Sequence, residues 1–248
     1  MYKTPVDIFI SGFLGTTDLW SDVKTEHSVC FELPGHNTCD NYHNKIEDHD
    51  TIDLLAEKIV KKFPPYPVRV TGYSMGARVA LFIAVNYSHK IKELILISVN
   101  PGIVDSEKRA ERIKHERGLE TFLKKNGLDN FVSMWQKLAI FDTQKKLNPD
   151  ILLKQRSMRL SHDPFQLAKA IRIMGLGAMP GLWPHLKTVK CPVTFIAGEK
   201  DTAYVKTAAK AAAKTEHANC CIIKKSGHNP IIENHEQIKK ILTQQHLY

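Results

Sequence analysis

The stretch that most constrains the fold is RVTGYSMGARVALFIA, residues 69–84. Its first part is a β-branched apolar run that is typical of a buried strand, and its last part is an apolar run of helix-forming residues. Only the short segment Gly72–Gly76 separates the two. A buried strand that passes directly into a buried helix is typical of a parallel sheet covered by helices, so the chain is predicted to have an α/β fold.

The rest of the chain repeats this alternation of strands and helices. Apolar runs predict strands over residues 6–11, 27–33, 68–74, 92–99, 191–199 and 219–227. Apolar residues at helical spacing predict helices over residues 51–63, 76–88 and 235–245. We therefore expect a mostly parallel central sheet flanked by helices, in a single domain that spans residues 1–248.

The segment from about residue 102 to 182 interrupts the alternation. It is rich in charged and helix-forming residues, and it contains no convincing strand. Because it lies between two predicted strands of the sheet, we interpret it as an inserted helical cap. Such caps close over a site and exclude water. A plain structural insertion is the alternative.

The chain carries a formal net charge of +9, which raises the question of an anionic partner. The lysines are scattered over helical segments, and no motif of basic and aromatic residues resembles a nucleic-acid site. No uninterrupted apolar run is long enough to cross a membrane. We therefore expect a solvated basic surface, no nucleic-acid partner and no membrane span, and the sequence leaves the oligomeric state open.

The cysteines and the N-terminus indicate the compartment. The five cysteines include no CxxC pair, so a disulfide framework or a zinc site is not expected. Those in or beside strand-like runs are predicted to be small buried side chains: Cys30, Cys191, Cys220 and Cys221. The chain begins without the pattern of a signal peptide, and a cytoplasmic location is predicted.

The segment Gly72-Tyr73-Ser74-Met75-Gly76 has the pattern GxSxG between a strand and a helix. Glycines on both sides of the serine prevent collisions in the tight bend, so the hydroxyl of Ser74 projects from the edge of the sheet. A serine hydroxyl needs a base, and the base needs an orienting carboxylate. On such a sheet the acid and then the histidine are expected after later strands.

Two segments supply these groups in that order. FIAGEKD places Asp201 after one late strand, and CCIIKKSGHNP places His228 after the next. Glu199 competes with Asp201, but Asp201 lies deeper in the loop, where it can reach the histidine. Other histidines follow no late strand, among them His36, His43, His49, His89 and His235. The predicted catalytic residues are therefore Ser74, Asp201 and His228.

Two backbone amides are expected to stabilise an oxyanion. One belongs to Met75, directly after the serine, and the candidate for the other is Phe13 in the loop of residues 11–15. An ordinary glycine turn is the alternative for that loop.

Arg78 lies one helical turn after Ser74, so its guanidinium can approach the site and bind an anionic group. A structural arginine is the alternative.

Several segments, taken together, carry a family resemblance: GFLG (12–15), LPGH (33–36), GYSMGAR (72–78), RAER (109–112), MWQKLAIF (134–141), MGLGAMPGLWP (174–184), GEKD (198–201) and GHNPIIEN (227–234). The chain resembles the α/β-hydrolase superfamily over nearly its whole length. More narrowly, it is similar to the menaquinone-pathway family of 2-succinyl-6-hydroxy-2,4-cyclohexadiene-1-carboxylate synthases.

The resemblance implies a lyase that eliminates pyruvate from 2-succinyl-5-enolpyruvyl-6-hydroxy-3-cyclohexene-1-carboxylate, with no cofactor or metal. Ser74 would remove a proton, and His228 and Asp201 would raise its basicity. Arginines and nearby aromatic residues would hold the small anionic substrate. The residues that carry over are Tyr73 and Arg78 beside the motif, and Arg112, Trp135 and Arg159 in the cap. The alternatives for the cap residues are surface arginines and a core tryptophan.

One departure separates this chain from the family pattern. Most relatives read His-Gly where this chain reads Ser11-Gly12, and that histidine usually supports the oxyanion loop. Serine keeps a hydrogen-bonding group but lacks the reach of the ring. Two other functions stay open: a carboxylester or carbon–carbon bond hydrolase in which Ser74 is acylated, and a non-catalytic binding protein. Retention of all three predicted catalytic residues argues against the last.

Overall fold

The computed structural model describes residues 7–36 and 44–244. Within them, a six-stranded parallel sheet has the order β2-β1-β3-β4-β5-β6. The strands are β1 (Asp7–Ile10), β2 (Ser28–Phe31), β3 (Val68–Tyr73), β4 (Ile91–Ile97), β5 (Val193–Gly198) and β6 (Ala218–Ile223). The predicted fold class is confirmed. Most predicted strands extend too far at their C-terminal ends, because those residues belong to loops.

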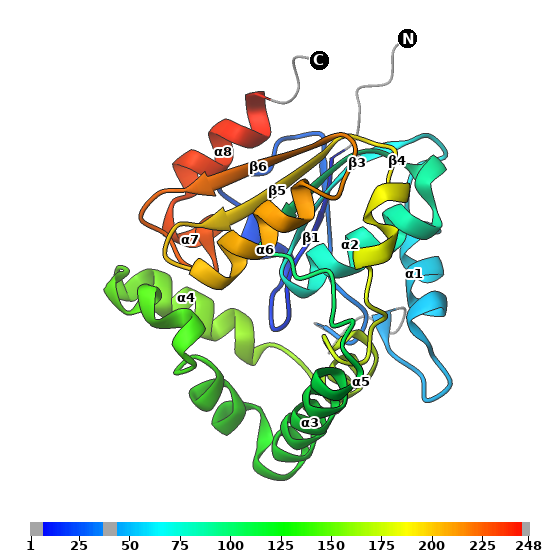
Figure 1. The fold of residues 1–248 in the computed structure, drawn as a ribbon. Helices are drawn as coiled ribbons and strands as arrows, with labels where there is room; N and C mark the ends of the chain where they lie inside the picture. Colours follow the sequence, from blue (N-terminus) through cyan, green and yellow to red (C-terminus); the bar gives the residue numbers. More distant parts are fainter. Residues whose placement is uncertain (1–6, 37–43, 245–248) are drawn as a thin grey trace.

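Helices cover both faces of the sheet (Figure 1). Ile8 and Ile10 of β1 pack in a core with α1 (Ile52–Val60), α2 (Met75–Asn86) and α6 (Thr202–Ala212). Phe9, between them, packs with residues of η1 (Thr17–Trp20), α7 (Pro230–Glu233) and α8 (His235–Gln244). Alternate side chains of one strand therefore enter opposite layers, as the pleat requires. The short helices η3 (Ser88–Lys90) and η5 (Trp183–Thr188) precede β4 and β5.

A buried ion pair ties the C-terminal helix to the sheet. Asp7 of β1 lies opposite Arg69 of β3 in the parallel ladder, and Nε of Arg69 donates to Oδ1 of Asp7 at 2.8 Å. A terminal nitrogen of Arg69 also donates to the carbonyl of Leu242 in α8 at 3.0 Å.

None of the described helices is long and apolar enough to span a membrane.

Helices alone fill the described chain between β4 and β5, apart from their connecting loops. They are α3 (Ser106–Trp135), η4 (Ala139–Lys146), α4 (Pro149–Leu160), α5 (Pro164–Met174) and η5, which has been given above. Figure 1 shows α3, α4 and α5 gathered beside one edge of the sheet. α3 is interrupted at Gly127, where φ is 77°. The division into core and cap at about residues 102 and 182 stays a prediction.

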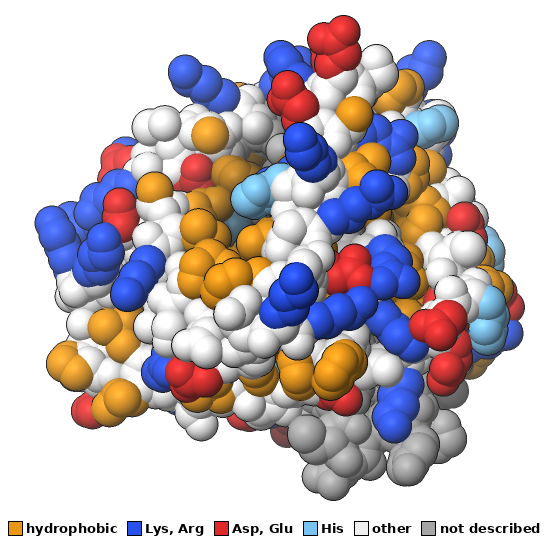
Figure 2. Space-filling model, turned by 90° about the horizontal axis from the view of Figure 1, so that it is seen from below, with side chains coloured by type: hydrophobic (Ala, Val, Ile, Leu, Met, Phe, Trp, Pro, Cys, Tyr) orange, Lys and Arg blue, Asp and Glu red, His pale blue; other side chains and the backbone are white. Residues whose placement is uncertain are grey.

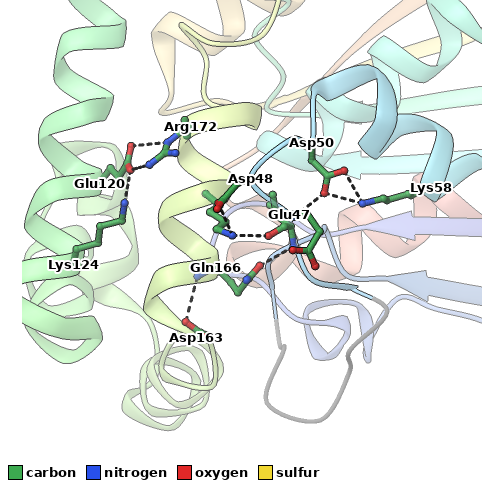
Figure 3. A network of polar contacts seen from close by, with 11 residues as sticks. Glu47, Asp48, Asp50, Lys58, Glu120, Lys124, Asp163, Gln166 and Arg172 are labelled. Carbon is green, nitrogen blue, oxygen red and sulfur yellow. Dashed lines mark hydrogen bonds and ion pairs between the residues drawn. The ribbon is translucent and has the colours of Figure 1, made fainter.

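Polar contacts connect α5 to the segment before α1 (Figure 3). Oε1 of Gln166 accepts from the backbone N–H of Ile46 at 2.7 Å, and Nζ of Lys169 donates to the Ile46 carbonyl at 3.0 Å. Lys169 also pairs with Asp48 at 2.8 Å. The inserted helices are thus attached to the core through side chains as well as through the chain itself.

The prediction that four cysteines are small buried side chains is wrong for Cys220, which is exposed. Cys30, Cys191 and Cys221 are half-buried. Three of the four lie on β2 or β6, which are the edge strands of the sheet and are covered less completely than the central ones. Burial raises the pKa of each of these thiols, which favours the unreactive protonated form.

Candidate active site

The bend between β3 and α2 holds Ser74 in a strained conformation, with φ at 52° and ψ at −111°. Its backbone N–H donates to the Ile97 carbonyl at 2.9 Å. A Cβ on Gly72 would lie 2.5 Å from Cα of Ala77, and one on Gly76 would overlap carbonyl oxygens at the end of β1. The glycines on both sides of the serine are therefore required by close approach of the backbone, as predicted.

The structure brings the three predicted catalytic side chains together. Oγ of Ser74 lies 3.2 Å from Nε2 of His228, and Nδ1 of His228 lies 2.8 Å from Oδ2 of Asp201. Oδ1 of Asp201 accepts from the backbone N–H of Tyr204 at 3.3 Å, so the same carboxylate caps α6. Glu199, the competing acid, binds Lys224 instead, at 2.9 Å.

Contacts that the sequence did not reveal fix the histidine. Its carbonyl accepts from Oγ of Ser98 at 2.7 Å. The carboxylate of Glu233 accepts from the backbone N–H groups of Gly227 at 2.7 Å and Asn229 at 3.2 Å, on either side of His228. The ring of Tyr204 packs edge-on against the imidazole, with 4.6 Å between centroids. The imidazole is thereby held between the serine and the aspartate.

The loop of residues 11–15 is held from two directions. Oγ of Ser11 donates to the Thr16 carbonyl at 2.7 Å and accepts from Nε1 of Trp20 at 2.9 Å. On the other side, Nε2 of His36 accepts from the backbone N–H of Leu14 at 3.2 Å. Ser11 therefore keeps a hydrogen-bonding role within the loop.

His36 follows no late strand, so it is not among the predicted catalytic residues, yet it lies in contact with this loop. Burial lowers the pKa of His36 to about 3, so the ring is neutral at physiological pH. The neighbouring His162 increases this effect, and its own pKa is lowered by burial to about 4. A neutral ring keeps Nε2 available as an acceptor.

Two adjoining pockets open at this edge of the sheet. The first, here called the Ser74 pocket, is lined by Ser74 and His228 together with Phe13, Tyr73, Met75, Arg78, Arg112 and Trp135. The second, the Arg159 pocket, contains Arg159 and Lys154 and shares with the first Phe13, Tyr73, Trp135 and Phe141. Viewed from the side of the inserted helices, the surface is hollowed where hydrophobic side chains gather, with basic side chains beside them (Figure 2).

Most of the predicted substrate-binding residues thus line the pocket of the serine, but Arg159 lies in the adjoining one. The two pockets share the aromatic side chains of Phe13, Tyr73, Trp135 and Phe141, here called the aromatic wall. The guanidinium of Arg159 lies 5.2 Å from the ring centroid of Phe141, and that centroid lies 6.1 Å from the ring centroid of His228. Trp135, a predicted contact, stacks on Phe131 at 5.6 Å, so it belongs to a hydrophobic core and to the pocket at once.

Two buried arginines make the site electropositive. A terminal nitrogen of Arg78 donates to the Met174 carbonyl at 3.0 Å, and its Nε has no hydrogen-bond partner within the described residues. Burial lowers the pKa of Arg78 and of Arg159 to about 10 each, so both stay charged at neutral pH. No ion pair to either is found in the described part of the chain. Buried cations without a carboxylate partner favour an anionic ligand.

Within residues 7–36 and 44–244, no group of histidine, cysteine, aspartate or glutamate side chains is arranged to hold a metal ion. The polar and ionisable groups at the site include the serine, the histidine, the aspartate, the arginines and the carboxylate of Glu116. Such a set supports proton transfer, acyl transfer and anion binding.

The α/β hydrolase fold family matches residues 8–235, and the chain belongs to this family. Within it, the structure of MenH from S. aureus is 31% identical, with a TM-score of 0.90, and the match covers 98% of this chain and 95% of that one. A Bacillus subtilis (strain 168) protein, named provisionally as a 2-succinyl-6-hydroxy-2,4-cyclohexadiene-1-carboxylate synthase, is 29% identical over 96% of this chain and 88% of its own length. A thermophilic esterase from Thermogutta terrifontis shares the fold at 18% identity and a TM-score of 0.80, covering 98% of this chain and 89% of its own.

Proposed function

We propose that the protein is a lyase of menaquinone biosynthesis. It eliminates pyruvate from 2-succinyl-5-enolpyruvyl-6-hydroxy-3-cyclohexene-1-carboxylate to give 2-succinyl-6-hydroxy-2,4-cyclohexadiene-1-carboxylate. The observation that carries the proposal is the pair of buried arginines, Arg78 and Arg159, in the two pockets beside Ser74. A substrate with three carboxylates needs several cations, whereas an uncharged ester does not. The similarity to synthases of this pathway supports the same reaction.

In the proposed mechanism, His228 accepts the proton of the Ser74 hydroxyl while Asp201 holds the imidazole in the required tautomer. The serine oxygen then removes a proton from the substrate ring. The electron pair of that C–H bond, at ring carbon 2, forms the C2–C3 double bond, the electrons of the existing C3–C4 double bond move to C4–C5, and the C–O bond between C5 and the enolpyruvyl group breaks. The leaving group departs with the electron pair as the enolate of pyruvate, which takes up a proton to become pyruvate.

Two backbone amides complete the proposed mechanism. Phe13 and Met75 both line the Ser74 pocket, and we assign their N–H groups to the negative charge that develops on the substrate. Arg78 and Arg112 would hold carboxylates on the side of the serine, and Arg159 would hold one beyond the aromatic wall.

The cytoplasmic location stays a prediction.

The direct test is release of pyruvate from the authentic intermediate, and this release is measured by coupling it to lactate dehydrogenase. We expect release by the purified protein and none by Ser74→Ala, because the variant has no hydroxyl to act as the base. Full activity in Ser74→Ala would remove the serine from the mechanism. Parallel assays with p-nitrophenyl esters test the hydrolase alternative, which fast ester turnover without pyruvate release would favour.

A further inference from the structure

A buried carboxylate lies in the pocket that is proposed to bind an anion. Glu116 of α3 is only 5% exposed and lines the Ser74 pocket together with Arg78 and Arg112. A negative charge here would repel an anionic ligand, so its presence requires another explanation.

The contacts of Glu116 supply that explanation. Oε1 accepts from Nε of Arg112 at 2.7 Å and from the backbone N–H of Leu176 at 2.7 Å, and Oε2 accepts from the backbone N–H of Gly177 at 3.1 Å. From the same helix, Nε of Arg109 donates to the Gly177 carbonyl at 2.8 Å. α3 therefore binds both the N–H and the C=O groups of the loop that follows α5, and Arg112 is attached to this arrangement.

Glycines in the loop allow this close contact. A Cβ on Gly175 would overlap Oε2 of Glu116, and a Cβ on Gly177 would lie 2.9 Å from the backbone nitrogen of Ile113 in α3. The glycines of MGLG, residues 174–177, thus let the helix approach the loop backbone. This contact brings the carboxylate to the side of the Arg112 guanidinium.

We propose that Glu116 is a positioning residue that fixes the guanidinium of Arg112 for binding of a substrate carboxylate. A guanidinium is planar, so a hydrogen bond through Nε fixes the plane that contains the two terminal amino groups. No hydrogen bond from those amino groups is found among the described residues, and both are available to a ligand. Without Glu116 the half-exposed side chain of Arg112 would have to be ordered when the ligand binds. The inference rests on the proposed function, because it assumes a carboxylate ligand.

The positioning role and simple charge repulsion predict opposite results. If the charge of Glu116 acted only by repulsion, its removal would tighten binding of an anion. If Glu116 positions Arg112, its removal weakens binding. The sign of the change therefore separates the two explanations.

Glu116→Gln is the principal variant, because it keeps a carbonyl oxygen that can accept from the loop. The matched control is Glu120→Gln, one turn along α3. Glu120 is similarly buried at 8% exposure and binds Arg172 and Lys124, but it does not line the Ser74 pocket (Figure 3). We expect Glu116→Gln to raise the KM for pyruvate release about tenfold with kcat changed less than about twofold, and Glu120→Gln to leave both within about twofold.

A double-mutant cycle shows whether the effect passes through Arg112. In an Arg112→Ala background, Glu116→Gln should change KM no further. Arg112→Lys keeps the charge but cannot be held through Nε, so it should raise KM to a similar extent while leaving the bonds from Glu116 to the loop intact. This variant tests the proposal even where a change at Glu116 impairs folding.

An unchanged or lower KM in Glu116→Gln, a fully additive cycle, or an Arg112→Lys variant with the KM of the wild type would overturn the proposal. Calorimetric titration with citrate, a tricarboxylate probe, repeats the cycle without turnover. The same pattern in citrate affinity, together with no release of pyruvate by the wild type, would reject the proposed reaction and retain the positioning role.

Discussion

The backbone N–H of Leu14 donates a hydrogen bond to Nε2 of His36 at 3.2 Å, across 22 positions of the chain. Leu14 has a φ of 61°, a left-handed conformation that is unfavourable for leucine and needs support from its surroundings. The residue before it, Phe13, carries the amide that we assign to the oxyanion. The histidine thus holds the loop in the conformation that sets the direction of this amide.

Loss of the acceptor at residue 36 is expected to impair catalysis more than binding. We predict that His36→Leu lowers kcat about tenfold or more with little change in KM. Loss of an oxyanion donor lowers kcat by a factor of about 10²–10³, and a donor that points in the wrong direction should lower it by a smaller factor. His36→Gln, whose carbonyl oxygen can accept from Leu14, should retain most of the activity. Steady-state kinetics of pyruvate release measure this. Equal losses in both variants would indicate that the hydrogen bond itself is unimportant.

The same histidine should make the fold sensitive to acid. The pKa of His36 is lowered to about 3 in the folded protein, whereas in the unfolded chain it lies near the ordinary value of about 6.5. Between these values the unfolded state binds more protons, so stability is fully present above about pH 6.5 and decreases as the pH falls toward 3. The loss from His36 alone is about 2 kcal/mol between pH 6.5 and 5.

Urea unfolding at several pH values measures this linkage. His36→Gln should reduce the slope of unfolding free energy against pH by close to one proton in that window, and the slope that is left includes His162, whose pKa is also lowered. An unchanged slope in the variant would contradict the assignment. Salt should affect the slope little, because His36 is completely buried.

The three predicted catalytic side chains could be located from the sequence because each is attached to the end of a strand. In a parallel sheet the C-terminal ends of all strands meet at one edge, so residues far apart in the chain are brought together by topology alone. Ser74, Asp201 and His228 follow β3, β5 and β6 in this way. Local patterns and one topological rule were sufficient.

Residues whose roles depend on packing through space could not be predicted. His36 accepts a hydrogen bond from a backbone N–H that lies 22 positions earlier in the chain. Glu116 accepts one from a backbone N–H that lies 60 positions later. Neither contact leaves a periodic or local signal in the sequence, and the close approach at Gly175 and Gly177 is seen only in the structure. Arg159 borders the site, but the aromatic side chains that place it in a second pocket are brought together by tertiary packing.

The geometry separates the two acids after β5. Asp201→Asn is expected to lower kcat by about 10³–10⁴, because the amide favours the wrong tautomer of His228. Glu199→Gln should keep kcat within about twofold of the wild type, since Glu199 binds Lys224 away from the histidine. The pyruvate assay on both variants checks this. A larger loss from Glu199→Gln than from Asp201→Asn would reverse the assignment of the orienting carboxylate.

Arg159 should lower stability while it supports binding. It is 7% exposed and, within the described residues, forms no ion pair, so its charge is buried mainly against the Phe141 ring. We predict that Arg159→Met raises KM about tenfold or more, equivalent to the 1.5–3 kcal/mol of a charged hydrogen bond, and increases the free energy of unfolding. Kinetics and urea unfolding measure the two effects. Unchanged KM would show that the Arg159 pocket does not bind substrate.

A matched pair of glycine substitutions tests the packing at the serine bend. In Gly76→Ala the new Cβ would overlap the carbonyl oxygens of Ile10 and Ser11, which belong to the backbone and cannot rotate away. We expect a loss of about 3 kcal/mol or more in the free energy of unfolding, together with loss of pyruvate release, because the end of β1 and the Ser74 bend must move apart. A Cβ added to Gly118 in α3 would meet no neighbouring atom within 4 Å, so Gly118→Ala should instead stabilise by about 1 kcal/mol at unchanged activity. Thermal and urea unfolding of both variants give the comparison, and equal stability of the two would mean that β1 does not approach the bend as closely as the structure shows.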